Sequence, residues 1–269
     1  MRERWGLDKP YHERYFKWVG DMVTKGELGF SMAYSQPVSA LIGERLALTV
    51  WLGIFTIVFT WTMAIPIGVL SAVKQYSVID YVFTFLSYLG VGTPNFLLAL
   101  VIMWFVWAWW DLKVTGLFSP HYVDEPWSFG RVIDLLKHIW VPMLVLGTDG
   151  TARFVRIIRA NLLDELQKPY VETARAKGLP EWKLVLKYPT RIALNPFIST
   201  LGWQLPALFS GSLIVAQVMS LPTLGPLLLE ALISQDMFLA GSIIMILTAL
   251  TMIGTLISDI LLALMDPRI

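Results

Sequence analysis

The sequence predicts an all-α polytopic membrane protein with five transmembrane helices. Of its 269 residues, 56% are hydrophobic and only 15% are charged, whereas soluble domains carry about 25% charged residues. The mean hydropathy is +0.62, and the apolar residues are gathered into runs close to the roughly 20 residues that a bilayer core requires. One long polar and basic interval, residues 164–196, interrupts these runs.

Five segments are expected to cross the membrane, at about residues 46–73, 82–110, 138–163, 197–219 and 237–265. The third is the weakest by hydropathy, because Asp149 and Arg153 are costly at membrane depth; it is needed to bring the chain from one side to the other. Residues 46–269 therefore form the transmembrane domain. Residues 1–45 form an extracytoplasmic or interfacial segment, and the helical spacing of apolar residues from Tyr11 to Met22 predicts a helix that lies at the membrane interface or packs on the protein.

The distribution of lysine and arginine orients these spans, because short basic loops remain in the cytoplasm. Residues 153–191 carry nine basic residues, whereas residues 222–236 carry none. The interval 164–196 is therefore predicted to be cytoplasmic and the later loop external. Five spans then place residues 1–45 outside, and we expect that a preceding span is missing from this chain or that translation starts upstream.

The cytoplasmic interval reads as a helix, a glycine turn and a second helix. Pro169 suits a first helical turn, Gly178 and Pro180 end that helix, and a second helix can begin near Glu181. A loop of this kind between two spans is suited to docking another protein, and small residues at Ala174 and Ala176 would let a partner surface approach closely.

In this setting, YVETARAKGLPEWKLVLKYPTRIALNP resembles the EAA motif of the permease subunits of binding-protein-dependent ABC importers, in the dipeptide/oligopeptide/nickel branch. The segments GELGFSMAYSQPVSALIGERLALT, GTPNF, LPTLGPLL and the final DPR are similar to that branch as well, so the resemblance covers essentially the whole chain. The chain departs from the branch at Tyr188, Pro189 and Thr190, and Pro189 is expected to shorten the second helix.

The resemblance implies a type I ABC importer permease fold, with a family pattern of six spans of which the first is absent here. It implies a cytoplasmic coupling helix that enters a groove on the ATPase, formed by Glu172, Thr173, Ala174, Arg175, Ala176, Lys177, Gly178 and Leu179. The partners it implies are a homologous second permease subunit in a heterodimer, two ABC ATPase subunits and an extracytoplasmic solute-binding protein, within the lipid of the cell inner membrane. The chain would form half of a pathway for peptides or related small solutes.

The composition argues against catalysis and against a metal or cofactor site on this chain. Cysteine is absent, and the three histidines have no metal-ligand spacing, so no metal site is expected. The sequence contains no G-x-x-x-x-G-K-[ST] phosphate loop and no Ser/His/Asp set, so we expect no catalytic residues and no cofactor here. ATP and Mg²⁺ would be bound by the partner ATPases. A net charge of +1 favours no nucleic-acid partner.

Polar residues within the predicted spans are candidates for lining the pathway: Asn95, Asp149, Gln204 and Gln217. The alternative is that the amides bond to neighbouring helices and that Asp149 pairs with Arg153 four residues on. Two other function classes were weighed. A secondary transporter predicts broken helices in two repeats and buried coupling carboxylates, and no duplication is visible; a membrane enzyme predicts a catalytic set that the sequence lacks.

Overall fold

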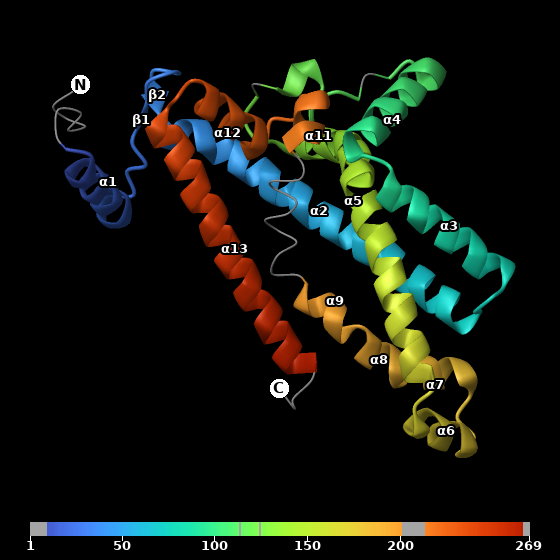
Figure 1. The fold of residues 1–269 in the computed structure, drawn as a ribbon. Coiled ribbons are helices and arrows are strands. Elements are labelled where there is room, and N and C mark those ends of the chain that lie inside the picture. Colours follow the sequence, from blue (N-terminus) through green and yellow to red (C-terminus); the bar gives the residue numbers. More distant parts are fainter. Residues whose placement is uncertain (1–9, 113, 124, 201–212, 266–269) are drawn as a thin grey trace.

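The computed structural model describes residues 10–112, 114–123, 125–200 and 213–265, and almost all of its regular structure is helical (Figure 1). In chain order the elements are α1 (Tyr11–Lys25), β1 (Phe30–Ser31), β2 (Gln36–Pro37), α2 (Val38–Val73), α3 (Val78–Gly92), α4 (Asn95–Trp110), η1 (Pro120–Tyr122), α5 (Phe129–Leu166), α6 (Pro169–Ala176), α7 (Glu181–Lys187), α8 (Pro189–Ala193), α9 (Asn195–Ser199), α11 (Leu213–Val218), α12 (Leu224–Ile233) and α13 (Met237–Met265).

The two longest helices, α2 and α5, form the centre of the fold, and α3 packs on α5 beside them (Figure 1). Small residues allow these helices to approach closely. A Cβ atom at Gly68 of α2 would lie 2.9 Å from the side chain of Ile158, and one at Gly90 of α3 would lie 2.8 Å from that of Ala152. Gly68 and Gly90 therefore serve helix packing against α5.

Among the described residues, α2 and α13 are long and apolar enough to cross a membrane, and the bent pair α3 and α4 becomes a third span if it is counted as one. The predicted segment 138–163 lies inside α5. The predicted segment 197–219 falls largely on residues 201–212, which lie outside the described residues. The arrangement of five spans therefore stays a prediction.

The predicted continuous segment 82–110 is divided into two helices that meet at 106°. The break follows from Pro94, which has no N–H to donate and disfavours helical backbone at the residue before it. Thr93 accordingly has an extended conformation (φ −92°, ψ 121°). Hydropathy averaged over the whole segment cannot register a change of direction of this kind.

The elements gather at two ends of the molecule (Figure 1). The helices α6 and α7 and the connection from α2 to α3 lie at one end, and β1, β2, η1 and α12 lie at the other. The basic interval and the loops that lack basic residues thus lie at opposite ends, which are named here the cytoplasmic and the external end after their predicted sides; the sides themselves stay a prediction.

The N-terminal segment contacts the external end of α13. Asp236, immediately before α13, accepts hydrogen bonds from the hydroxyl of Ser31 at 2.6 Å and from the backbone N–H of Ala33 at 3.2 Å. Its other carboxylate oxygen accepts from the N–H of Leu239 at 3.1 Å. Helix α1 buries none of its residues, although its Trp18 side chain donates to the carbonyl of Leu28 at 3.1 Å. Val19 and Met22 of its apolar face are half-buried, whereas Tyr11 and Tyr15 are exposed, so whether α1 lies at the membrane interface or packs on the protein stays a prediction.

Candidate functional site

The predicted helix–turn–helix of the cytoplasmic interval is present as the α6–α7 hairpin, residues 169–187. Pro169 occupies the start of α6, where its missing N–H costs no hydrogen bond. Gly178 has a positive φ of 76°, which glycine adopts without strain, and its N–H donates to the carbonyl of Arg175 at 3.0 Å. The second helix ends at Lys187 and α8 begins at Pro189, so the shortening expected from that proline is confirmed.

The inner face of the hairpin is buried against the cytoplasmic ends of the two central helices. Val171 and Ala174 of α6 and Leu184 and Val185 of α7 are buried in one cluster, which also contains Ala72 of α2, Leu162 of α5 and Ala193 of α8. Each fully buried valine or leucine side chain contributes about 1.5–3 kcal/mol. The hairpin is therefore attached by apolar packing to the ends of α2 and α5.

The outer face of the hairpin carries most of the residues predicted to couple to an ATPase. Six of the eight are exposed: Glu172, Thr173, Arg175, Ala176, Lys177 and Gly178. Ala174 is buried in the inner face, and Leu179 is half-buried against the same cluster. The predicted set thus divides into an exposed surface and two residues that attach this surface to the membrane helices.

Polar contacts hold both ends of the hairpin. The Arg175 guanidinium donates to both carboxylate oxygens of Glu181 across the turn, at 2.6 and 3.1 Å, and holds the pKa of the Glu181 carboxyl below its usual value. At the start of the hairpin, Lys168 and Tyr170 both donate to the largely buried carboxylate of Glu165. Burial, followed by this hydrogen bond, raises the pKa of Tyr170.

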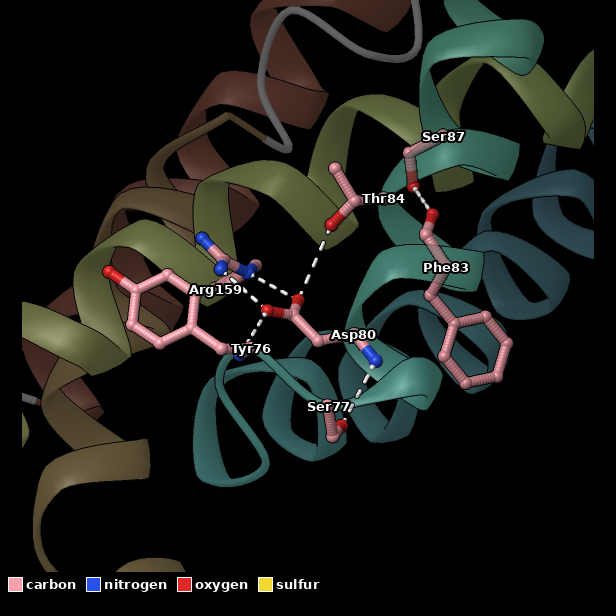
Figure 2. A network of polar contacts seen from close by, with 7 residues as sticks. All are labelled: Tyr76, Ser77, Asp80, Phe83, Thr84, Ser87 and Arg159. Carbon is pink, nitrogen blue, oxygen red and sulfur yellow. Dashed lines mark hydrogen bonds and ion pairs between the residues drawn. The ribbon is translucent and has the colours of Figure 1, made fainter.

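An ion pair between a buried carboxylate and a half-buried arginine joins α3 to α5 near the cytoplasmic end (Figure 2). Nε and Nη2 of Arg159 donate to the two carboxylate oxygens of Asp80, each at 2.7 Å. Asp80 is 2% exposed and also accepts from the backbone N–H of Tyr76 and the hydroxyl of Thr84. With its carboxylate fully bonded, this pair fixes the first turn of α3 to the part of α5 that leads to the hairpin.

Sequence reasoning missed this pair, although a signal was present. A charged residue beside or within an apolar span is costly unless it is paired. The two residues are 79 positions apart, so their pairing depends on the packing of α3 on α5 and cannot be found from local spacing.

The predicted pathway residues that the structure describes lie on three different helices, and their role stays a prediction. Asn95 is half-buried at the start of α4, Gln217 is exposed on α11, and Gln204 lies outside the described residues. Asp149 pairs with Arg153 at 3.1 Å, four residues on in α5, so the local ion pair weighed as the alternative is present. Within the described residues, no hydrogen bond or ion pair joins Asn95, Asp149 and Gln217 to one another.

The part of the chain that the structure describes contains no group of three histidine, aspartate or glutamate side chains able to hold a metal ion. The candidate site is therefore built from a hairpin with an exposed polar face, packed by its apolar face on α2 and α5, and from the ion pair that joins α5 to α3.

Comparison with known proteins agrees with this arrangement. Residues 64–269 match the family described as binding-protein-dependent transport system inner membrane component. The chain belongs to this family. It is 36% identical over 99% of its length to the oligopeptide transport system permease protein AppB of Bacillus subtilis (strain 168), of which the match covers 83%. It is 31% identical over 98% of its length to the dipeptide transport system permease protein DppB of Escherichia coli (strain K12), of which the match covers 82%.

The fold is found among solved structures as well. A chain of the MetNI methionine ABC transporter, in an inward-facing conformation, superposes with a TM-score of 0.64 over 84% of this chain and 96% of that one, at 15% sequence identity. At that identity the likeness shows the fold alone. Together with the family, it identifies a multi-pass permease subunit of an ABC importer in the inner membrane, which functions with ATPase and solute-binding partners. These findings support an ATP-driven importer over the ion-coupled transporter.

Proposed function

We propose that this permease forms half of the translocation pathway for peptides or related small solutes and couples to separate ATPase subunits through residues 172–179. In this proposal it pairs with a homologous second permease in a heterodimer, with two ATPases and one external binding protein. ATP and Mg²⁺ are bound by the ATPases, and the permease itself carries out no hydrolysis. The names of the relatives, an oligopeptide and a dipeptide permease, support peptides as the solute.

The observation that carries the coupling proposal is the two-faced α6–α7 hairpin. Its outer face is polar and exposed, with Glu172, Arg175 and Lys177 available to a partner. Its inner face is buried against α2 and α5. A loop that only contacted solvent would need no such attachment to α2 and α5. An element that transmits movement needs one face to bind the ATPase and another to contact the helices that move.

The attachment defines which helices a moving ATPase would displace. A push on the hairpin acts on Ala72 at the end of α2 and on Leu162 in the last turns of α5. The pair between Arg159 and Asp80 then carries the displacement from α5 to α3. Closure of the ATPases would in this way rearrange three helices together, and the external binding protein would deliver solute when the pathway opens to its side.

The substitution Gly178→Asp tests the coupling role. An added Cβ at Gly178 meets no atom within 4 Å of the chain itself, and aspartate tolerates a positive φ better than most residues. The permease should therefore still insert, while a carboxylate now projects from the outer face of the hairpin. We expect ATP-driven peptide uptake by the reconstituted importer to be lost, with normal amounts of permease in the membrane.

Gly20→Asp is the matched control, because Gly20 is an exposed glycine of α1 whose added Cβ also meets open space. That variant should transport normally. Gly178→Asn separates charge from size at the hairpin itself. Full ATP-driven uptake by Gly178→Asp, at normal membrane levels, would disprove docking through this surface.

A further inference from the structure

The external end of the permease contains a cavity that no step of the coupling mechanism uses. It has a volume of about 290 Å³ and lies between the first turns of α2, the start of α5 and the loops on either side of Gly116 and Ser220. The N–H of Gly116 donates to the carbonyl of Met219 at 2.8 Å, which ties the two loops together. The volume is at the lower end of the range of about 300–1,000 Å³ for small-molecule sites, so it suits one end of a larger solute.

The floor of the cavity contains a buried arginine. Arg131 is 4% exposed, and its guanidinium lies over the ring of Phe118 at 4.5 Å and over that of Trp127 at 4.9 Å. It donates to the carbonyl of Val123 at 3.1 Å and to the carboxylate of Glu44. Its Nε is buried and has no hydrogen-bond partner, and a buried donor left unpaired is costly.

The edge of a guanidinium formed by Nε and Nη2 can bind both oxygens of one carboxylate, as two other ion pairs in this structure show. In Arg159 and Arg175 the Nε and Nη2 atoms together bind both oxygens of one carboxylate, which is the strong bidentate geometry. In Arg131 only Nη2 contacts Glu44, whose side chain is 47% exposed. The bidentate edge of Arg131 is therefore half-used.

A second guanidinium adds to the positive charge. Arg45 also lines the cavity and is half-exposed, and its guanidinium makes no hydrogen bond or ion pair with the described part of the chain. Two guanidinium groups face one carboxylate, so the charged lining has a net charge of +1. The remaining wall is largely apolar, with Leu48, Leu117 and Pro222. A cationic pocket with apolar walls is complementary to a carboxylate carried next to an apolar side chain.

We propose that this cavity is a subsite for the terminal carboxylate of the incoming peptide, bound by Arg45 and by the half-used edge of Arg131. The proposal rests on the proposed function, since it takes peptides as the solute. The apolar wall would receive the C-terminal side chain. Glu44 would act as an internal competitor that holds Arg131 until the solute carboxylate arrives.

The test compares alanyl-phenylalanine with its C-terminal amide in the reconstituted importer, complete with its binding protein. The ratio of the two uptake rates is measured for the natural permease and for Arg45→Gln. Because the same binding protein serves both importers, a change in the ratio reports on the permease alone. Loss of one charge-assisted contact to the carboxylate should lower uptake of the free acid at limiting concentration about tenfold and leave the amide unchanged.

A second variant, Glu44→Gln, is expected to change the ratio of acid to amide uptake in the opposite direction. It removes the competing carboxylate and raises the net charge of the lining from +1 to +2, so the ratio of acid to amide should rise. A merely structural role for these residues would lower the uptake of both peptides alike. Arg14→Gln, which removes an arginine of α1 on the external side, is the control and should leave the ratio unchanged.

Two outcomes would overturn the subsite. An unchanged ratio in Arg45→Gln, with ATP-driven peptide uptake intact, would refute carboxylate binding here while leaving the proposed function standing. Equal loss of both peptides, with weaker binding of the labelled binding protein to the permease, would assign the cavity to docking of that protein. An importer that takes up neither peptide with ATP would instead refute the proposed function.

Discussion

Helix α5 carries an arginine near each end, and the two are used differently. Arg159 and Arg131 are separated by roughly 40 Å at a helical rise of 1.5 Å per residue. At the cytoplasmic end Arg159 is bidentate to Asp80, whose carboxylate is saturated and 2% exposed (Figure 2). At the external end Arg131 holds Glu44 with one nitrogen, while that carboxylate remains 47% exposed.

The same two residue types can therefore form a permanent contact between helices or a contact in which another carboxylate can replace the first. A carboxylate bonded by a bidentate arginine, a backbone N–H and a hydroxyl has no capacity left for another ligand. A half-exposed carboxylate with one contact can be displaced by a second carboxylate at small cost. The cytoplasmic pair therefore suits transmission of movement between α3 and α5, and the external pair suits recognition.

The largest expected effect is at the cytoplasmic pair. Arg159→Gln leaves the buried Asp80 without its counter-charge, and breaking a buried pair in this way costs about 3–5 kcal/mol. We expect a clear fall in the thermal denaturation midpoint of the purified importer complex. The double variant Asp80→Asn with Arg159→Gln should recover a large part of the loss, because neither side chain is then charged. If Arg159→Gln were as stable as the natural protein, the ion pair would not hold α3 to α5.

A smaller effect is expected at the external pair. Glu44→Gln removes a half-exposed carboxylate, and Arg131 keeps the carbonyls of Val123 and Glu125. The buried Arg131 guanidinium loses its counter-charge, but the amide oxygen of glutamine can still accept from it and the rings of Phe118 and Trp127 remain beside it. We therefore expect a loss of about 1.5–3 kcal/mol, as for one hydrogen bond to a charged group. The same thermal measurement checks this. A loss as large as that of Arg159→Gln would contradict the distinction between the two ends.

The smallest effect is expected at the hairpin turn. Arg175 and Glu181 form a bidentate pair, yet both side chains are more than half exposed. If bidentate geometry decided how much an ion pair stabilises the fold, this pair would contribute as much as that of Asp80. If burial decides, it contributes the least of the three pairs. We expect Arg175→Gln to leave the denaturation midpoint of the complex unchanged within error. A fall comparable to that of Arg159→Gln would mean that geometry outweighs burial in these pairs.

Local signals made the hairpin predictable from the sequence. Pro169, Gly178 and Pro189 each act on backbone within one turn of their own position, and the structure places helix boundaries at or next to all three. The pairing of Asp149 with Arg153 was accessible for the same reason, because helical spacing brings these residues together.

Tertiary packing decided the features that the sequence did not reveal. The angle between α3 and α4 depends on what each helix contacts after Pro94 interrupts the chain. Asp80 and Arg159, and likewise Glu44 and Arg131, meet only because α2 and α3 pack on α5. The choice of Asn95, Asp149, Gln204 and Gln217 as pathway residues relies on polarity within spans and stays a prediction.

The contacts of Asp236 have a consequence for the order in which the chain can be completed. Its carboxylate binds Ser31 and Ala33 near the start of the described chain and the first turn of the last helix. Proteins are synthesised from the N-terminus, so Ser31 and Ala33 leave the ribosome before their acceptor has been made. These hydrogen bonds therefore form only after Asp236 and the start of the last helix have been synthesised, and a chain truncated before Asp236 cannot form them.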